Sequence, residues 1–155
     1  LREHTRYHDG KLYWTVRKGT MRVDEVCGGT SVDKNGYHTM AFNGLKTSLH
    51  RFIWMYHYGP FDHDIDHING NARDNRIENL RKCSRSQNLM NRGKFKNSTS
   101  KYKGVYFRKD IKKWQASICI EGKTKHLGVF TCELAAHEAW VAAAAPHHGA
   151  FLRCD

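Results

Sequence analysis

Most of the chain consists of short extended segments separated by turns that contain Gly and Asn. Apolar residues with helical spacing occur only in limited stretches. A β-prone segment spans Lys11–Arg17, and Asn35-Gly36 introduces a second one at Tyr37–Phe42, which a hairpin-type turn at Asn43-Gly44 follows. At Leu49–Tyr58 the spacing becomes helical. Short strands interrupted by separate helices predict an α+β fold. One apolar stripe should form along this first helix, from Leu49, Phe52, Ile53 and Tyr56.

The length of 155 residues allows one ordinary domain or two small ones, and 39% hydrophobic residues are enough for compact cores. No apolar run approaches the roughly 20 residues that span a bilayer. Leu1–His4 does not resemble a signal peptide, and the missing initiating Met indicates a trimmed chain or a fragment. We therefore expect neither a transmembrane protein nor a secreted disulfide-rich miniprotein.

The five cysteines are odd in number and form no CxxC pair. Their spacing is not that of a structural zinc site. Reduced thiols in a cytoplasmic protein are the simplest interpretation.

The positive charge is concentrated in one third of the chain. Between Arg76 and Lys125 there are 15 of the 26 basic residues and three acidic ones. The net charge of this stretch is therefore +12, and that of the whole chain is +11. One interpretation is a solvated lysine-rich surface. Because aromatic residues are interleaved with the charges, a polyanion-binding surface, most often for nucleic acid, explains the stretch better. These aromatics are Phe95, Tyr102, Tyr106, Phe107 and Trp114.

The middle of the chain has the order strand, loop, strand, helix. Short strands are predicted at Ile65–Ile68 and Leu80–Cys83, with a turn-rich loop between them. Ser84–Gln87 has the S-x-x-Q form of a capping box, so a short helix should begin there. Asn88, Asn91 and Arg92 fall on one side of that helix.

The C-terminal part is predicted to be a three-stranded antiparallel sheet packed on one helix. Strands are expected at Gly104–Arg108, Trp114–Ile120 and Lys123–Phe130, with a tight turn at Glu121-Gly122. Thr131 is the predicted N-cap of an Ala-rich helix. That helix should cover residues 132–145 and end at Pro146.

The segment from Ser48 to Asn91 resembles the HNH endonucleases of the phage-encoded and homing-type branch. The resemblance rests on long ordered motifs: LHRFIW at 49–54, GP at 59–60, IDHING at 65–70, DNRIENLR at 74–81 and S-x-SQN at 84–88. It implies a ββα-metal (His-Me finger) nuclease motif, which agrees with the predicted order of elements.

The resemblance also implies roles for four residues. His67 would be the general base that takes a proton from the attacking water, since an imidazole with a pKa near ~6.5 is mostly neutral at cellular pH. Asp66 and Asn88 would bind one divalent cation, with Asn in place of the motif's final His. Their hard oxygen ligands favour Mg²⁺ or Mn²⁺. Asn79 would hold the loop and orient His67.

Two details of this motif stay open. Strict alternation along a strand would send Asp66 and His67 to opposite faces, so the strand must end or twist there. His50 is interpreted as a helix-start residue that packs beside the ββα unit, with Arg51 touching phosphate.

The segment from Ser100 to Ala145 resembles the APETALA2-type DNA-binding domain of plant transcription factors. The residues that carry this resemblance are KYKGV at 101–105, KWQASI at 113–118, LGVF at 127–130 and the Ala-rich helix. Such domains lay the sheet in the major groove of DNA. Alternation predicts that Val105, Phe107, Ala116, Ile118 and Ile120 face the helix. The residues predicted to face outward are Tyr106, Arg108, Gln115, Ser117 and Cys119, with Lys125 or His126 from the third strand. The residues expected to contact DNA are Arg51, Arg81, Arg85, Arg92, Tyr106, Arg108, Lys109, Lys112, Lys113, Gln115, Ser117, Lys125 and His126.

These interpretations define four segments: a nuclease domain at 1–92, a linker at 93–101, an APETALA2-type domain at 102–146 and a tail at 147–155. The expected function is metal-dependent hydrolysis of phosphodiester bonds in double-stranded DNA by a monomer, in a bacterial or phage-infected cell. No membrane and no small-molecule cofactor is expected to take part. Two alternatives are a DNA-binding protein of the same ancestry that has lost cleavage, and an RNA substrate.

Overall fold

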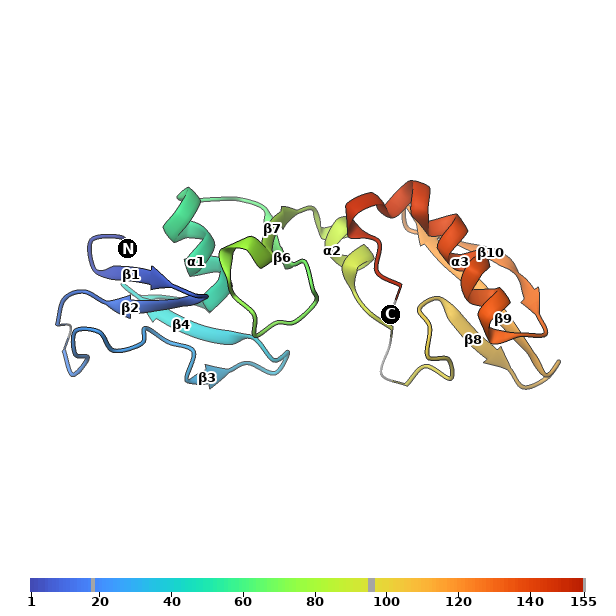
Figure 1. The fold of residues 1–155 in the computed structure, drawn as a ribbon, viewed down its shortest axis with the longest axis horizontal. Coiled ribbons are helices and arrows are strands. Elements are labelled where there is room, and N and C mark those ends of the chain that lie inside the picture. The colour runs from blue at the N-terminus through green and yellow to red at the C-terminus, as the bar shows by residue number, and fades with distance from the viewer. Residues whose placement is uncertain (18, 95–96, 155) are drawn as a thin grey trace. The chain divides into compact units, whose positions relative to one another are not determined.

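The computed structural model of the chain describes residues 1–17, 19–94 and 97–154. Phe95, the middle of the predicted linker 93–101 and the last residue of the predicted tail lie outside the described residues. The chain forms two compact units, Leu1–Ser84 and Arg85–Asp155 (Figure 1). Within the described part, none of the helices combines the length and the hydrophobicity that a membrane crossing requires.

Two small antiparallel sheets open the first unit. Strand β1 (Thr5–His8) pairs with β2 (Lys11–Trp14), and β4 (His38–Phe42) lies between β3 (Ser31–Val32) and β5 (Leu45–Ser48). Strand β2 stops three residues short of the predicted Arg17. The predicted turn at Asn43-Gly44 is confirmed, with φ of 48° and 79°, as expected of a two-residue hairpin loop with both central residues at positive φ.

Helix α1 covers Leu49–Tyr58, the predicted range. Its side chains Leu49, Phe52 and Ile53 are buried, while Tyr56 is packed at the edge of the core. The helix ends at Gly59, whose N–H donates to the carbonyl of Met55. The core of the first unit consists of Leu12, Trp14, Cys27, Met40, Leu49, Phe52, Ile53, Ile65 and Leu80.

A further hairpin follows α1 and carries the candidate site. Strand β6 (Asp64–His67) pairs antiparallel with β7 (Leu80–Cys83), and the 3₁₀ helix η1 (Ile77–Asn79) leads into β7. Helix α2 (Arg85–Asn91) comes next and begins directly after Ser84, as the capping-box pattern predicts. The order β6, β7, α2 is consistent with a ββα-metal fold.

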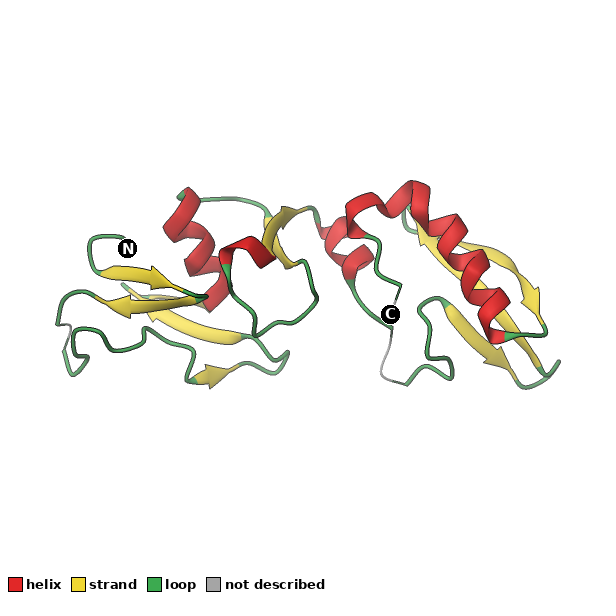
Figure 2. Ribbon diagram, in the orientation of Figure 1, coloured by secondary structure: helices red, strands yellow, loops and turns green. Residues whose placement is uncertain are grey.

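The second unit has a three-stranded antiparallel sheet covered by one helix, as predicted (Figure 2). Its strands are β8 (Val105–Arg108), β9 (Lys113–Ile120) and β10 (Lys123–Phe130), with β9 in the middle. Helix α3 (Glu133–His148) packs on this sheet. The buried core consists of Val105, Ala116, Ile118, Ala136, Trp140 and Ala144.

Both predicted ends of α3 are wrong. The N-cap is Cys132 rather than Thr131, and Pro146 lies inside the helix, which continues to His148. Proline removes one backbone hydrogen bond to the preceding turn. The buried ring of His148 packs on the ring of Trp140, 5.7 Å away, and this contact holds the last turn in place.

The residues after α3 are also structured. The 3₁₀ helix η2 (Gly149–Phe151) follows α3 and packs against α2. Leu152 packs on the core of the second unit. The predicted boundary between domain and tail at 146 therefore falls within α3, and the described part of the tail belongs to the second unit.

Candidate active site

Asp66 and His67 occupy the last two positions of β6 and are both buried, with 6% and 4% of their surfaces exposed. Asp66 is opposite Arg81 on β7, and its Oδ2 accepts a hydrogen bond from Arg81 Nε at 2.9 Å and lies 2.8 Å from Nη2 in the same ion pair. A buried carboxylate is costly unless it is paired, and Arg81 supplies that pairing. The side chain of Arg81 is only 17% exposed, and its contact with DNA stays a prediction.

The ring of His67 packs against aromatic neighbours. It lies 4.8 Å from the ring of His50 and 5.8 Å from that of Tyr37. Its Nε2 lies 3.0 Å from Oδ1 of Asn75. Burial lowers the pKa of His67 below its ordinary value, although the bond to Asn75 opposes this. The imidazole is therefore neutral at cellular pH, the form that a general base requires.

The loop between β6 and β7 is held together by Asn79, which is buried. Its Oδ1 accepts from the N–H of Asn69 at 3.0 Å, while its Nδ2 donates to Asn69 Oδ1 and to the carbonyl of Asp74 at 3.0 and 2.7 Å. Arg76 donates twice to the carboxylate of Asp74, which lowers the pKa of Asp74 to about 2. The side chain that reaches His67 is Asn75 and not Asn79.

The N-terminal hairpin supports the same loop from outside. The hydroxyl of Tyr7 accepts hydrogen bonds from the N–H groups of Ile77 and Gly10, at 2.9 and 3.1 Å. Gly10 has a φ of 74°, and a Cβ there would lie 2.9 Å from the backbone nitrogen of Arg76. A side chain at this position would push the loop away, so Gly10 permits the close approach.

His50 and Arg51 begin α1 beside the candidate site. His50 is buried against His67 and Tyr37, and burial lowers its pKa to about 3. The predicted packing of His50 beside the hairpin is thus observed, with His67 itself as a neighbour. The guanidinium of Arg51 lies over the ring of Phe61, 4.7 Å from its centroid, and its contact with phosphate stays a prediction.

The second predicted metal ligand, Asn88, lies on α2 in the second unit and is half-buried. Among residues 1–17, 19–94 and 97–154, no group of three or more His, Cys, Asp or Glu side chains forms a metal site. The predicted ligands Asp66 and Asn88 would not appear as such a group, because they are one carboxylate and one amide. Ligation by Asp66 and Asn88 stays a prediction.

The outward face of the second unit's sheet carries several of the predicted DNA-contacting residues. Strand pairing places Tyr106 opposite Gln115, Arg108 opposite Lys113, and His126 opposite Ser117. Lys125 pairs with Ile118, which is buried under α3, so His126 rather than Lys125 shares the outward face. Arg108 donates to Gln115 Oε1 at 3.0 Å and to Asp110. The exposed residues Lys109, Lys112 and Lys113 flank this row.

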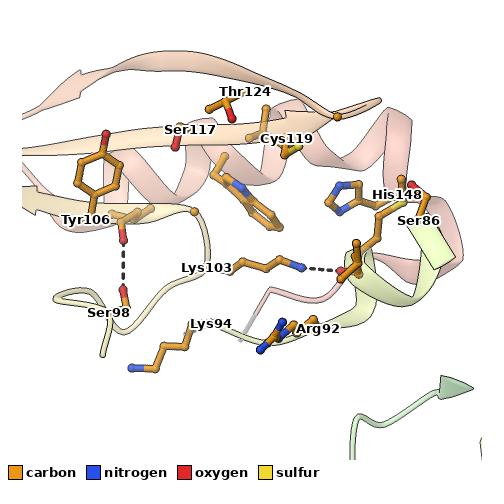
Figure 3. Close-up of a pocket in the computed structure, with 18 of the residues that line it drawn as sticks. Ser86, Arg92, Lys94, Ser98, Lys103, Tyr106, Ser117, Cys119, Thr124 and His148 are labelled. Atoms are coloured by element: carbon orange, nitrogen blue, oxygen red, sulfur yellow. Dashed lines mark hydrogen bonds between the residues drawn. The ribbon is translucent and has the colours of Figure 1, made fainter. Parts of the chain in front are cut away.

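A hollow of about 850 Å³ adjoins the sheet within the second unit (Figure 3). Arg85 and Arg92 from the α2 region and Tyr106 and Ser117 from the sheet line it, so it brings together four residues predicted to contact DNA. Lys103 crosses the hollow and donates to the carbonyl of Met90 at 2.5 Å (Figure 3).

Comparison with known proteins supports the interpretation of the segment from α1 to α2. Residues 48–90 match the family model described as HNH endonuclease. The chain is also similar to Protein 3.8 of Escherichia phage T7, with 33% identity over 76 residues, or 48% of this chain and 63% of that protein. The chain thus spans less than two thirds of that relative's length. No solved structure matches the chain.

Residues 48–90 are therefore similar to an HNH endonuclease domain. The match includes Asp66, His67, Asn79 and Asn88, and it ends before the sheet of the second unit. Sequence reasoning assigned no role to Asn75 or Tyr7. The only sequence signal for Asn75 was its place in the DNRIENLR motif. No sequence signal indicated Tyr7, because its hydrogen bond with Ile77 joins residues 70 positions apart.

Proposed function

We propose that the protein is a metal-dependent endonuclease that hydrolyses phosphodiester bonds in DNA, phage-encoded or of the homing type. The observation that carries the proposal is His67: a buried, neutral imidazole, fixed by a hydrogen bond and adjacent in sequence to the buried carboxylate of Asp66, within an HNH endonuclease domain. A perturbed base beside a carboxylate is a common arrangement of hydrolytic sites.

The contact with Asn75 defines which nitrogen of His67 can act as the base. Because Asn75 Oδ1 is an acceptor, Nε2 of the neutral ring carries the proton. The basic lone pair is then on Nδ1, which would take a proton from the water that attacks phosphorus. Burial keeps the ring from protonation before the reaction, and Asn79 keeps the loop around it in one conformation.

The donor set fits a hard divalent cation such as Mg²⁺ or Mn²⁺. Asp66 offers a carboxylate and Asn88 an amide oxygen, and such cations prefer oxygen ligands. When bound, the cation supplies Lewis-acid stabilisation of the charge that develops on the phosphate. Arg81 holds the carboxylate of Asp66 in place through an ion pair between two paired strands.

The second unit would anchor the DNA. It contains 13 basic and five acidic residues, and its outward sheet face presents Tyr106, Arg108, Gln115, Ser117 and His126. The lysines beside this face would contact phosphates, which position a protein on the duplex without reading sequence. An APETALA2-type mode, with the sheet in the major groove, is the docking geometry that we propose.

Incubation of supercoiled plasmid with the protein tests the proposal. We expect open-circular or linear product in the presence of Mg²⁺ or Mn²⁺ and none in EDTA. The variant Asp66→Asn keeps the side-chain shape but removes the charge that balances Arg81 and attracts the cation, so its product should fall to the level of plasmid without protein.

The matched control is Asp62→Asn, an exposed acid shortly before β6, which should cleave like the wild type. Wild-type protein that binds the plasmid but leaves it supercoiled with both cations would contradict the nuclease proposal. That outcome would favour a DNA-binding protein that has lost cleavage, a function that the basic second unit could perform alone.

Salt dependence tests the proposed DNA-binding face separately. Each phosphate neutralised adds about 0.9 to the slope of log K against log salt, because condensed counterions are released. We expect the double variant Lys109→Ala/Lys113→Ala to reduce this slope by up to about 2 in fluorescence-anisotropy titrations. The exposed Lys34 on the first unit is the control, and an equal change in Lys34→Ala would count against the proposed face.

A further inference from the structure

We propose that Asn75 is a positioning residue that fixes the tautomer and orientation of His67, and that Tyr7 of the N-terminal hairpin holds the segment that carries Asn75. The inference rests on the proposed function and adds to it a set of residues that set the catalytic geometry. The juxtaposition that carries it is a chain of contacts from Tyr7 through the backbone at Ile77 to Asn75 and then to His67.

Asn75 is suited to this role because it is nearly as buried as His67, with 4% of its surface exposed. A neutral histidine can carry its proton on either nitrogen, and the hydrogen bond at the other nitrogen decides between the two forms. With Oδ1 of Asn75 3.0 Å from Nε2, the Nε2–H form is favoured. An apolar residue at position 75 would leave this nitrogen buried without its acceptor, which is unfavourable.

Asn79 cannot take over this function from its observed position. Its Oδ1 accepts from the backbone of Asn69, and its Nδ2 donates to Asn69 and Asp74. These bonds close the loop on itself. The two asparagines therefore have different roles. Asn79 stabilises the loop, and Asn75 extends from the loop to the ring of His67.

The backbone on both sides of Asn75 is restrained. On one side, Asn79 Nδ2 donates to the carbonyl of Asp74 at 2.7 Å. On the other side, the N–H of Ile77 donates to the hydroxyl of Tyr7 at 2.9 Å, and Gly10 packs directly on the peptide between Asn75 and Arg76. The N-terminal hairpin thus supports the loop of the active site although it contributes no reacting group.

The test compares Asn75→Leu, Asn75→Asp and wild type in the full-length protein. Long-range ¹H–¹⁵N NMR of the histidines at pH 8 reports the tautomer of His67 without any need for cleavage. We expect the Nε2–H form in the wild type and in Asn75→Asp, which keeps an oxygen acceptor, and a mixture of both forms in Asn75→Leu. The rate constant kcat for plasmid cleavage by Asn75→Leu should fall about 10–100-fold with KM unchanged, as for lost outer support of a catalytic group.

Asn71→Leu is the control, because Asn71 is an exposed side chain of the same loop that accepts from the N–H of Arg73. It should change neither the tautomer nor kcat. A loss of kcat in Asn75→Leu with the His67 tautomer unaltered would overturn the positioning role. A wild type with the expected tautomer but no cleavage would instead contradict the proposed function and leave the contact between Asn75 and His67 intact.

Tyr7→Phe provides a second test of the proposal if Asn75→Leu does not fold. This change removes the acceptor for Ile77 and keeps the ring that packs on Tyr56 and His57. We expect hydrogen exchange at the amide of Ile77 to become at least tenfold faster and kcat to fall several-fold. Unchanged exchange and unchanged kcat would show that the hairpin does not hold the loop.

Discussion

Replacing His67 with alanine is expected to lower the rate of DNA cleavage about 10²–10⁴-fold, the usual contribution of a positioned general base. The physical reason is that no other group would be left to take the proton at this place. The ring of His50 lies 4.8 Å from that of His67, but burial lowers its pKa to about 3, so it is a far weaker base. Single-turnover cleavage of supercoiled plasmid measures the effect.

Two controls make the result specific. His8→Ala removes an exposed histidine of β1 and should leave the rate unchanged. His67→Ala should bind the same duplex in EDTA as tightly as the wild type, and its thermal unfolding curve should overlay that of the wild type. Undiminished cleavage by His67→Ala would contradict the proposed mechanism.

The pH dependence checks the same group in the unaltered protein. Because burial lowers the pKa of His67 below about 6.5, the neutral base forms as pH rises through that lowered pKa. The wild-type cleavage rate should therefore rise with pH and reach its plateau at a lower pH than a histidine of ordinary pKa would give. A rate that keeps rising tenfold per pH unit between 7 and 9 would indicate that another group limits the reaction.

Elements with strong local signals were predicted well from the sequence. Helix α1 has its predicted bounds because Leu49, Phe52 and Ile53 fall on one helical face and Gly59 ends the helix. The hairpin at Asn43-Gly44 follows from residues that tolerate positive φ. The alternation of Ala116 and Ile118 with Ser117 and Cys119 likewise predicted which face of β9 is buried.

Features that depend on distant contacts were missed. Pro146 is a local stop signal, yet α3 continues because His148 packs on Trp140 from the far side of the proline. The contact between Asn75 and His67 was not predicted, because the sequence spacing does not show which amide of the loop reaches His67. Tyr7 was missed for the same reason: its partner Ile77 belongs to another hairpin.

The ion pair between Asp66 and Arg81 was also not predicted from the sequence. Both residues were assigned roles toward ligands, one toward a cation and the other toward DNA. Pairing of β6 with β7 puts them opposite each other, and burial then makes their pairing nearly obligatory. Strand register therefore links the candidate metal ligand to a basic residue that composition alone would place in the DNA footprint.

Gly104→Ala is expected to destabilise the second unit by about 3–5 kcal/mol, from overpacking together with a positive φ. Gly104 precedes β8 with a φ of 71°, and a Cβ there would overlap the indole of Trp140 and lie 2.8 Å from the carbonyl oxygen of Ser117. Trp140 is 2% exposed at the centre of this core and cannot move aside. The carbonyl of Gly104 also accepts from the N–H of Ser117 at 2.9 Å, so the backbone cannot retreat without losing that bond.

Gly122→Ala separates crowding from backbone strain. Gly122 has a similar φ of 78°, and no described atom lies within 4 Å of where its Cβ would be, so only about 1–2 kcal/mol of strain is expected. Thermal unfolding gives the overall change, and hydrogen exchange of amides in β9 assigns it to the second unit. Equal losses in the two variants would contradict the close approach of Gly104 to Trp140. A selective loss in Gly104→Ala, with exchange in α1 unchanged, would show that the core under the proposed DNA-binding sheet depends on the absence of one methyl group.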